Sequence, residues 1–222
     1  MDDKKICFIT SVNDIECYNK SLSSWQELEV PRGYSVDSLA VFEAESMTKA
    51  YQSAMEASDA KYKIYLHQDV WITQRNFLMV MLKAFQNDAS LGIAGVVGSK
   101  SLPPTGVWWH GEKIGAVCDN HDGTMKEYLY ERSARQCKEA VALDGLILMT
   151  QYDIPWRTDL FQRWHFYDLS QCMEFRKRGF TAGVIPQPWP GVLHWCGLNP
   201  MDGYKEEREK FIAEYFLYLP QS

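Results

Sequence analysis

Three polar clusters stand directly after apolar, strand-like runs of the sequence. They are Asn13-Asp14, His67-Gln68-Asp69 and His194. In an open α/β sheet, ligands bind where the loops at the carboxyl ends of the strands converge. A carboxylate and an imidazole can together hold a divalent ion when phosphate oxygens and water complete its shell. The clusters therefore predict an incomplete metal site, although Asp69 could instead cap a helix beginning near Thr73, and His194 could be a hydrogen-bonded structural residue.

Asp168 offers a second kind of chemistry, because it directly precedes the helical run of residues 169–178. A carboxylate in that place can cap the helix and stabilise it by roughly 1 kcal/mol. A carboxylate on a rigid element that faces a cleft can also act as a general base. The two roles are compatible, since one oxygen can cap while the other points outward, and spacing alone leaves both open.

Alternating strand-like and helical segments must position these side chains. Apolar runs predict strands over residues 5–10, 38–42, 61–66, 92–97, 143–150 and 181–185. Amphipathic spacing predicts helices over residues 45–58, 76–85, 168–178 and 203–217. Gly179 is expected in the left-handed conformation after the third helix, and the last helix is expected to dock by its Phe211, Tyr215 and Phe216 face. Strands that alternate with helices indicate an α/β layer with a largely parallel sheet.

The middle of the chain, residues 98–122, is rich in Gly, Pro and Trp. It is predicted to form long loops with short strand pieces at residues 107–109 and 115–118, and loops of that length are usually functional. Trp109 in this region could stack on the flat apolar face of a ligand or simply supply buried area. Residues 126–138 mix charges of both signs and are predicted to be a mobile loop or a surface helix.

One further acidic group in the middle of the chain resembles a metal loop. It consists of Asp119, His121 and Asp122. No regular ligand spacing follows these residues, so a solvated turn is the preferred interpretation.

Composition narrows the possible functions. The chain has 222 residues, 46% of them apolar and 23% charged, as expected of one globular domain. A net charge of −6 provides no broad basic surface for duplex nucleic acid. The six cysteines are widely spaced without a CxxC pair and are expected to be reduced thiols. No run approaches the ~20 apolar residues of a membrane span, and no signal-peptide core is present, so a cytoplasmic protein without a transmembrane segment is expected.

Several segments, in order and with matching spacing, resemble the family 2 glycosyltransferases. They most resemble a short glycosyltransferase-like group in which LHQDV replaces the usual two-aspartate metal motif. The likeness runs from about Ile6 to Gly197 and rests on ICFITSVND, MTKAYQSAMEASDAKYKIYLHQDVWI, IAGVVGS with the following WW, DGLILMT, WHFYDLSQCMEFRKRGF and VLHWCG.

The resemblance implies one GT-A domain, a Rossmann-like α/β fold of nucleotide-diphospho-sugar transferases with a mostly parallel central sheet. Residues 1–100 would form its nucleotide-binding half, residues 101–200 its acceptor and catalytic half, and residues 201–222 a C-terminal docking helix. By position, the resemblance implies that Asp168 is the catalytic base. It implies that Mn²⁺ or Mg²⁺ binds to Asp69 and His194, with His67 as a possible further ligand. The donor-binding positions that it implies are Asn13, Asp14, Gln68, Asp69, Trp109, Asp144 and Gly145.

The implied activity is inverting, metal-dependent transfer of a sugar, as hexose or N-acetylhexosamine, from a nucleotide sugar. The donor would be a UDP-sugar, and the acceptor a hydroxyl of a glycan, a lipid-linked molecule or a protein. His67 stands where the family's metal motif begins with an aspartate, which motivates an alternative: a degenerate member that binds a nucleotide or glycan without turnover. A sugar nucleotidyltransferase is less favoured, because the loop after the first strand lacks glycine and has no basic residue before Lys20.

Overall fold

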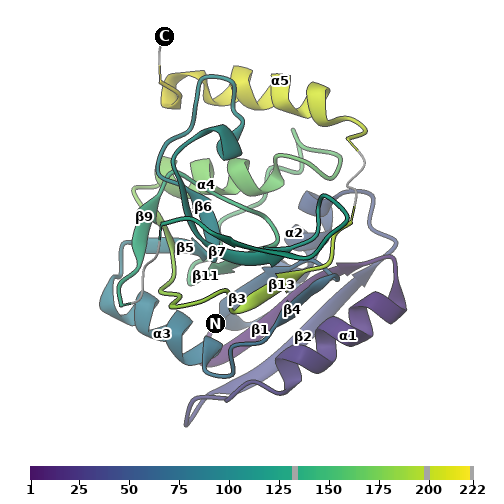
Figure 1. Cartoon of the computed structure of the whole chain (residues 1–222), viewed down its shortest axis with the longest axis vertical. Helices are drawn as coiled ribbons and strands as arrows, with labels where there is room; N and C mark the ends of the chain where they lie inside the picture. The colour runs from purple at the N-terminus through teal and green to yellow at the C-terminus, as the bar shows by residue number, and fades with distance from the viewer. Residues whose placement is uncertain (132–134, 198–200, 221–222) are drawn as a thin grey trace.

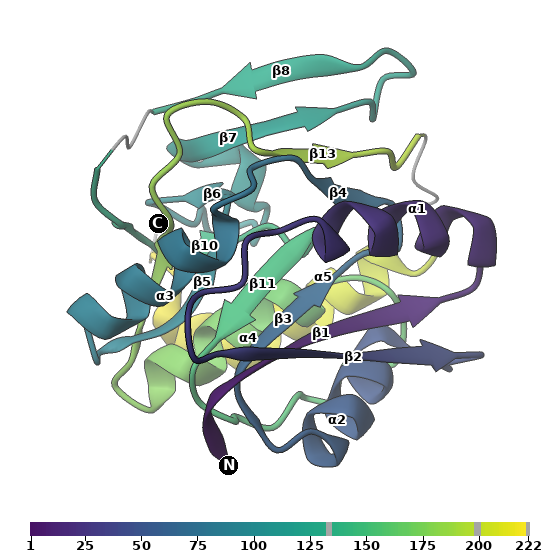
Figure 2. The same ribbon diagram turned by 90° about the horizontal axis from the view of Figure 1, so that it is seen from below.

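Two β-sheets lie side by side in the protein, and most of the helices gather around the central one (Figures 1 and 2). The computed structural model describes residues 1–131, 135–197 and 201–220. The first sheet has the strand order β2-β1-β3-β11-β5-β12-β9. Its strands are β1 (Asp2–Val12), β2 (Ser35–Phe42), β3 (Ala60–Leu66), β5 (Leu91–Gly95), β9 (Lys138–Ala140), β11 (Ile147–Thr150) and β12 (Thr181–Val184).

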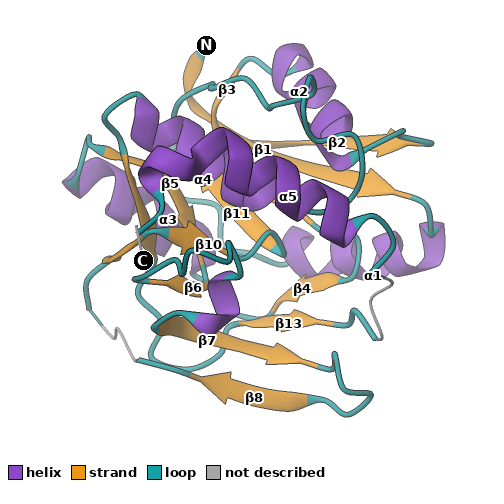
Figure 3. Ribbon diagram, turned by 90° about the horizontal axis from the view of Figure 1, so that it is seen from above, coloured by secondary structure: helices purple, strands orange, loops and turns teal. Residues whose placement is uncertain are grey.

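The second sheet is smaller and has the order β10-β6-β7-β13-β4, with β8 paired to β7. In Figure 3 it forms the lower layer of orange strands, away from the N-terminus. Its strands are β4 (Val70–Ile72), β6 (Val97–Ser99), β7 (Lys113–Asp119), β8 (Lys126–Leu129), β10 (Ala142–Leu143) and β13 (Val192–His194).

The central sheet is mixed, which corrects the prediction of a mostly parallel sheet. β1 runs parallel to both β2 and β3, and β5 runs parallel to β12. β11 lies between β3 and β5 and is antiparallel to both, and β9 is antiparallel to β12. The direction of β11 follows from its connection, because it enters from the neighbouring sheet rather than through a crossover helix.

Helices bury both faces of the central sheet. Along β1, Ile6 and Phe8 pack with Trp25 of α1 (Ile15–Gln26) and with α3 (Phe77–Asn87). Cys7 and Ile9 point the other way and pack with α2 (Met47–Ala57) and α4 (Tyr167–Lys177). The strand reads as a continuous apolar run because both of its faces are covered.

The C-terminal helix α5 (Tyr204–Tyr215) lies outside α4 (Figure 1). Phe211 and Tyr215 are fully buried, as predicted, whereas Phe216 is more than half exposed in the short 3₁₀ turn η2 (Phe216–Tyr218). Gly179 follows α4 with φ +83°, and the N–H of Phe180 returns to the carbonyl of Phe175, which confirms the predicted left-handed helix end. None of the described helices combines the length and apolar character of a membrane span.

Several elements differ from the sequence predictions. The strands predicted over residues 92–97 and 143–150 are each divided between the two sheets, as β5 and β6 and as β10 and β11. Helix α1 was not predicted, because its polar residues follow the first strand and resemble a loop. Residues 107–109 were predicted as a strand, but they belong to the segment around the 3₁₀ turn η1 (Trp108–His110). Residues 126–138 were predicted as a loop or helix, but they begin with β8, and residues 132–134 lie outside the described part of the chain.

Within the described residues, the chain crosses between the two sheets four times through connections of one to three residues. His67-Gln68-Asp69 joins β3 to β4, Val96 joins β5 to β6, Val141 joins β9 to β10, and residues 144–146 join β10 to β11. Two of these crossings contain predicted site residues. The sheets therefore meet where the sequence predicted chemistry, and we call this boundary the seam.

Candidate functional site

Three ligand atoms meet at the seam, one each from His67, Asp69 and His194. His67 Nδ1 lies 3.4 Å from His194 Nε2. Asp69 Oδ1 lies 3.5 Å from His194 Nε2 and 3.9 Å from His67 Nδ1. β13 brings His194 there by pairing with β4, and the Trp195 N–H donates to the Asp69 carbonyl at 2.8 Å. The structure thus brings together the predicted metal ligands, including His67.

The chemistry of this group fits a small divalent ion. Ligand atoms around one such ion, with bonds of ~2.1 Å, lie roughly 3.0–3.5 Å apart. Two of the three separations fall in that range, and the 3.9 Å between His67 Nδ1 and Asp69 Oδ1 exceeds it. Among the described residues, Asp69 Oδ1 is buried and receives no hydrogen bond, and an unsatisfied buried carboxylate oxygen is costly. A cation between this oxygen and the two ring nitrogens would satisfy it.

Electrostatics at His194 also favour a positive charge at this place. Burial alone would lower the pKa of His194, but its hydrogen bond to Asp119 and the nearby carboxylate of Asp69 outweigh that effect and raise the pKa well above its ordinary value. Burial would likewise raise the pKa of Asp69, yet the facing His194 and His67 hold it below the ordinary value. The two acids stay ionised around a site that accepts a cation.

His67 differs from His194 in its protonation. Burial, reinforced by the neighbouring His194, lowers the pKa of His67 to about 4 although Asp69 opposes the shift. The ring is therefore neutral at pH 7, the form in which imidazole binds metals. Its Nε2 forms a short hydrogen bond with the hydroxyl of Tyr167, the first residue of α4. Tyr167 thus links the metal cluster to the helix that contains Asp168.

Asp168 lies in the first turn of α4 and does not cap it. The capping position belongs to Phe166, a non-glycine residue with φ +58°. Asp168 Oδ1 accepts from the N–H of Leu169 at 2.8 Å, and Oδ2 accepts from the N–H of Gly145 at 3.0 Å. Burial and then the neighbouring Asp144 raise the pKa of Asp168 to about 7. A carboxylate with that pKa suits general-base chemistry near neutral pH.

Gly145 lies where a side chain would collide with Tyr167. A Cβ at this position would stand 2.1 Å from the Tyr167 hydroxyl oxygen. The preceding residue, Asp144, accepts the N–H of Leu146 at 3.0 Å, and burial raises its pKa. The crossing at residues 144–146 therefore supports both Tyr167 and Asp168, and two of the predicted donor-binding positions lie beside the predicted base.

Asn13, Asp14 and Gln68 form a separate web at the end of β1. Gln68 Oε1 accepts the N–H groups of Asn13 and Asp14, both at 2.9 Å, and its amide nitrogen donates to the Asn13 side chain. Asp14 caps α1 by accepting the N–H groups of Glu16 and Cys17, each at 3.0 Å. These three predicted positions thus lie together, and Asp14 has a structural role of its own. Asp69 caps no helix, because β4 follows it and α3 begins only at Phe77.

Trp109 lies apart from that web. It belongs to η1, is 42% exposed, and its ring contacts Trp108 and Tyr204, the first residue of α5. Tyr204 in turn contacts Phe166, at the start of the Asp168 helix. The structure places Trp109 with the elements around Asp168.

Asp119 contributes to the cluster, contrary to the expectation of a solvated turn. It is 9% exposed, and its Oδ2 accepts a hydrogen bond from His194 Nδ1 at 2.9 Å. Burial alone would raise its pKa, but His194 and the N–H of His121 lower it. The register of β7 beside β13 produces this contact, since Asp119 stands opposite His194. Asp119 and His194 are each the last residue of a short apolar strand. This shared position was the signal in the sequence that could have identified Asp119 as part of the site.

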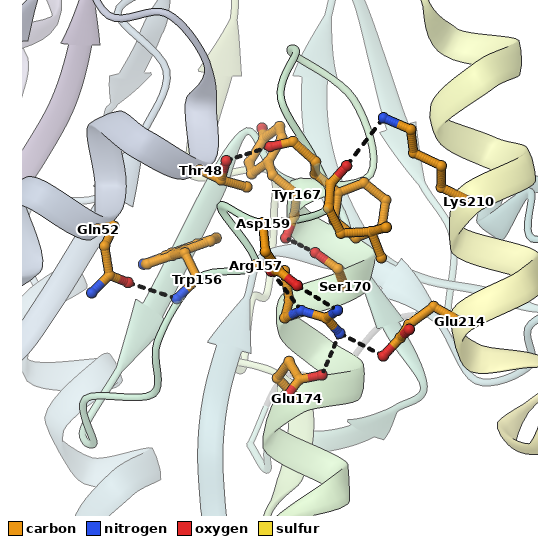
Figure 4. A network of polar contacts seen from close by, with 12 residues as sticks. Thr48, Gln52, Trp156, Arg157, Asp159, Tyr167, Ser170, Glu174, Lys210 and Glu214 are labelled. Carbon is orange, nitrogen blue, oxygen red and sulfur yellow. Dashed lines mark hydrogen bonds and ion pairs between the residues drawn. The ribbon is translucent and has the colours of Figure 1, made fainter.

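A polar network holds the segment that leads into α4 (Figure 4). Thr48 donates to the Phe161 carbonyl, and Gln52 Oε1 accepts the Trp156 N–H at 2.8 Å. Arg157 binds Glu214 of α5 at 2.6 Å and is 3.4 Å from Glu174 of α4. Contacts with α2, α4 and α5 therefore hold in place the chain segment that precedes Asp168.

Solved structures share this fold. S. aureus TarS residues 1–349 with UDP matches at a TM-score of 0.60 and 11% identity, over 98% of this chain and 67% of that one. The mannosyltransferase PcManGT from Pyrobaculum calidifontis, with GDP-Man and Mn²⁺, matches at 0.56 and 12%, over 99% and 65%. A longer TarS structure is covered to 40%, so the chain spans about 40–67% of the length of these three matched structures. A comparison with curated proteins finds no match.

The fold that these structures define is that of the GT-A glycosyltransferases. Residues 7–215, nearly the whole chain, match a glycosyltransferase-like family. The chain belongs to that family.

Proposed function

We propose that this protein is an inverting, metal-dependent glycosyltransferase that uses a UDP-sugar. The observation that carries the proposal is the buried, unsatisfied Asp69 Oδ1 facing the ring nitrogens of His67 and His194. Support for a nucleotide sugar comes from relatives of the same fold, since TarS was solved with UDP and with UDP-GlcNAc. PcManGT was solved with GDP-Man and Mn²⁺. The donor sugar is proposed to be a hexose or an N-acetylhexosamine.

The proposed ion, Mn²⁺ or Mg²⁺, would be held by Asp69 and His194, with His67 completing the set. When bound, it would supply positive charge to the leaving diphosphate. Asn13, Asp14 and Gln68 would border the nucleotide at the end of β1, and Asp144, Gly145 and Trp109 would border the sugar and acceptor.

Asp168 is proposed to take the proton from the acceptor hydroxyl as that oxygen attacks the anomeric carbon. A base on the face opposite the leaving group gives inversion. The bonds from Leu169 and Gly145 hold the carboxylate in place, so it needs little reorganisation during the reaction. The acceptor is proposed to be a hydroxyl of a glycan, a lipid-linked molecule or a protein.

We also propose that residues 1–222 act as one domain. Residues 1–100 would bind the nucleotide, residues 101–200 would provide the base and the acceptor contacts, and residues 201–222 would brace the Asp168 helix.

Thermal unfolding in a panel of nucleotide sugars, with and without Mn²⁺, tests the proposal. A ligand that binds only the folded state raises the unfolding temperature. We expect a UDP-sugar with Mn²⁺ to stabilise the protein and Asp69→Ala to remove the metal-dependent part of the shift. Metal-dependent release of UDP from that donor should also disappear in Asp69→Ala. A panel without any metal-dependent shift would contradict the proposal.

One observation favours a second candidate, a binding module without turnover. By the family resemblance, His67 stands where the metal motif begins with an aspartate, and its Nε2 is already engaged by Tyr167. Tight binding of a nucleotide sugar, with no UDP release under any metal or acceptor, would support this alternative.

A further inference from the structure

Asp119 forms a hydrogen bond with His194 on the side of the ring that faces away from Asp69. The two residues stand opposite each other where β7 and β13 run parallel, and both are buried. His194 Nδ1 donates to Asp119 Oδ2 at 2.9 Å. Because Nδ1 is directed at Asp119, the opposite nitrogen, Nε2, is the one that faces Asp69.

The orientation of Asp119 is itself fixed. Its second oxygen, Oδ1, accepts the backbone N–H of His121 at 2.7 Å and also lies 2.7 Å from the His121 ring nitrogen Nδ1. Asn120 accepts the N–H of Gly197 at 3.0 Å, which ties this turn to the chain after β13. A backbone N–H can only donate. Asp119 Oδ1 must therefore remain an acceptor, and Oδ2 is left for His194.

We propose that Asp119 is a positioning residue that presents the Nε2 lone pair of His194 to the divalent ion beside Asp69. The inference rests on the metal site of the proposed function and adds a residue that does not touch the ion. A carboxylate behind a metal-binding histidine fixes which ring nitrogen carries the hydrogen and strengthens the other as a ligand. Loss of such a partner typically weakens metal binding 10–100-fold.

Asp119→Asn provides a sharp test because the amide has the size of the carboxylate but a different hydrogen-bonding pattern. The His121 N–H requires the amide oxygen on its own side, so the amide NH₂ group faces His194 Nδ1. Nδ1 must then accept, and the hydrogen moves to Nε2, where it blocks the ion. We expect the dissociation constant for Mn²⁺ to rise about 100-fold, the upper end of the usual range.

Asp119→Ala separates positioning from packing. The smaller side chain leaves room for water, which can accept the hydrogen of Nδ1 and preserve the useful ring form. We therefore expect a smaller loss of about 10-fold. A purely structural role predicts the opposite order, because alanine removes more contacts than asparagine. Asp122→Asn in the same turn is the matched control, since that acid pairs with Lys126, and it should leave Mn²⁺ binding unchanged.

The experiment titrates Mn²⁺ alone into the full chain and follows free Mn²⁺ by electron paramagnetic resonance, after circular dichroism has shown that each variant is folded. Nitrogen NMR of the histidine rings with Mg²⁺ adds a readout that is independent of activity. It should place the hydrogen of His194 on Nδ1 in the wild type and on Nε2 in Asp119→Asn. Equal Mn²⁺ affinity in the wild type and Asp119→Asn, or a greater loss in Asp119→Ala, would overturn this inference alone. A wild type that binds no Mn²⁺ would overturn the metal site as well.

Discussion

At the level of single residues, the surroundings of two acids drive their protonation in opposite directions. Asp168 is buried beside Asp144, and its pKa rises to about 7. The pKa of Asp69 lies below its ordinary value because two imidazoles face it. One acid can therefore exchange a proton near neutral pH while the other stays negative. Environments that separate two acids in this way are a common mark of divided roles in a site.

Replacing Asp168 by asparagine should separate catalysis from binding. The amide oxygen can still accept the N–H of Gly145, while the N–H of Leu169 loses its acceptor, and the side chain can no longer take a proton. We expect transfer to fall by ~10²–10⁴-fold. Donor affinity measured by calorimetry with Mn²⁺ should be unchanged. A variant that transfers sugar at the wild-type rate would exclude Asp168 as the base.

The raised pKa of Asp168 predicts opposite pH dependences for turnover and stability. Turnover needs the ionised base, so it should increase as the pH rises through about 7. The folded-state pKa lies above the ordinary value of 3.8, so the folded state binds this proton more tightly than the unfolded state. The stability from Asp168 is thus present below about pH 4 and is lost as the pH rises through about 7.

Rates and urea unfolding of the wild type between about pH 4 and 8, with Asp168→Asn as the control for unfolding, test both trends. The stability difference between the two proteins should change with pH in this window. A turnover profile that is flat across pH 7 would contradict the assignment.

At the level of elements, the segment before α4 is held by its neighbours. Glu207 of α5 is fully buried and accepts the N–H of Gln162 at 2.9 Å through one oxygen and that of His165 at 3.2 Å through the other. On the other side, Met47 of α2 donates to the Arg163 carbonyl at 3.1 Å. α5 therefore acts on Asp168 indirectly, through the backbone that enters its helix.

Glu207→Gln should weaken this connection. A glutamine side chain has one acceptor oxygen, so one of the two backbone N–H groups would face an amide NH₂ group. Leaving a buried donor unsatisfied costs about 1–3 kcal/mol in the free energy of unfolding. Urea unfolding measures the loss, and the exposed neighbour Glu206→Gln is the matched control. Equal stability of the two variants would show that the connection contributes nothing.

The elements differ in how far local sequence determines them. The continuous apolar run of β1 and the glycine after α4 were sufficient to predict those features. Helix α1 was missed, because its start depends on the Asp14 cap and only three of its residues are buried. The direction of β11 was also missed. It depends on a crossing from the other sheet, and no local pattern encodes that pairing.

Part of the candidate site also depends on strand pairing that no local sequence pattern encodes. Residues at strand ends, such as Asp69 and His194, could be predicted because their position along a strand places them at one edge of the fold. Asp119 could not, because its role depends on the alignment of β7 with β13. Its spacing in the chain resembles a turn, and only the tertiary register shows that it is buried against His194.

At the level of the whole molecule, the protein consists of two sheets with different connections to the site. Asn13 directly follows β1 of the central sheet, and His67 directly follows β3. The smaller sheet supplies His194 and Asp119. Residues 144–146 return the chain to the central sheet beside Asp168. Neither sheet contains the full set of side chains, so the site exists only when both sheets are in place.

The seam has a dynamic consequence. An ion held by His67, which follows β3 of the central sheet, and by Asp69 and His194 of the smaller sheet would link the two sheets. Backbone amides in β13 and β7 should then exchange their hydrogens with deuterated solvent more slowly when Mn²⁺ is added, because local opening would require release of the ion. Amides of β2, on the far edge of the central sheet, provide the internal reference and should change little. Mass spectrometry of the deuterated peptides would show whether cation binding slows amide exchange in the smaller sheet alone or throughout the protein.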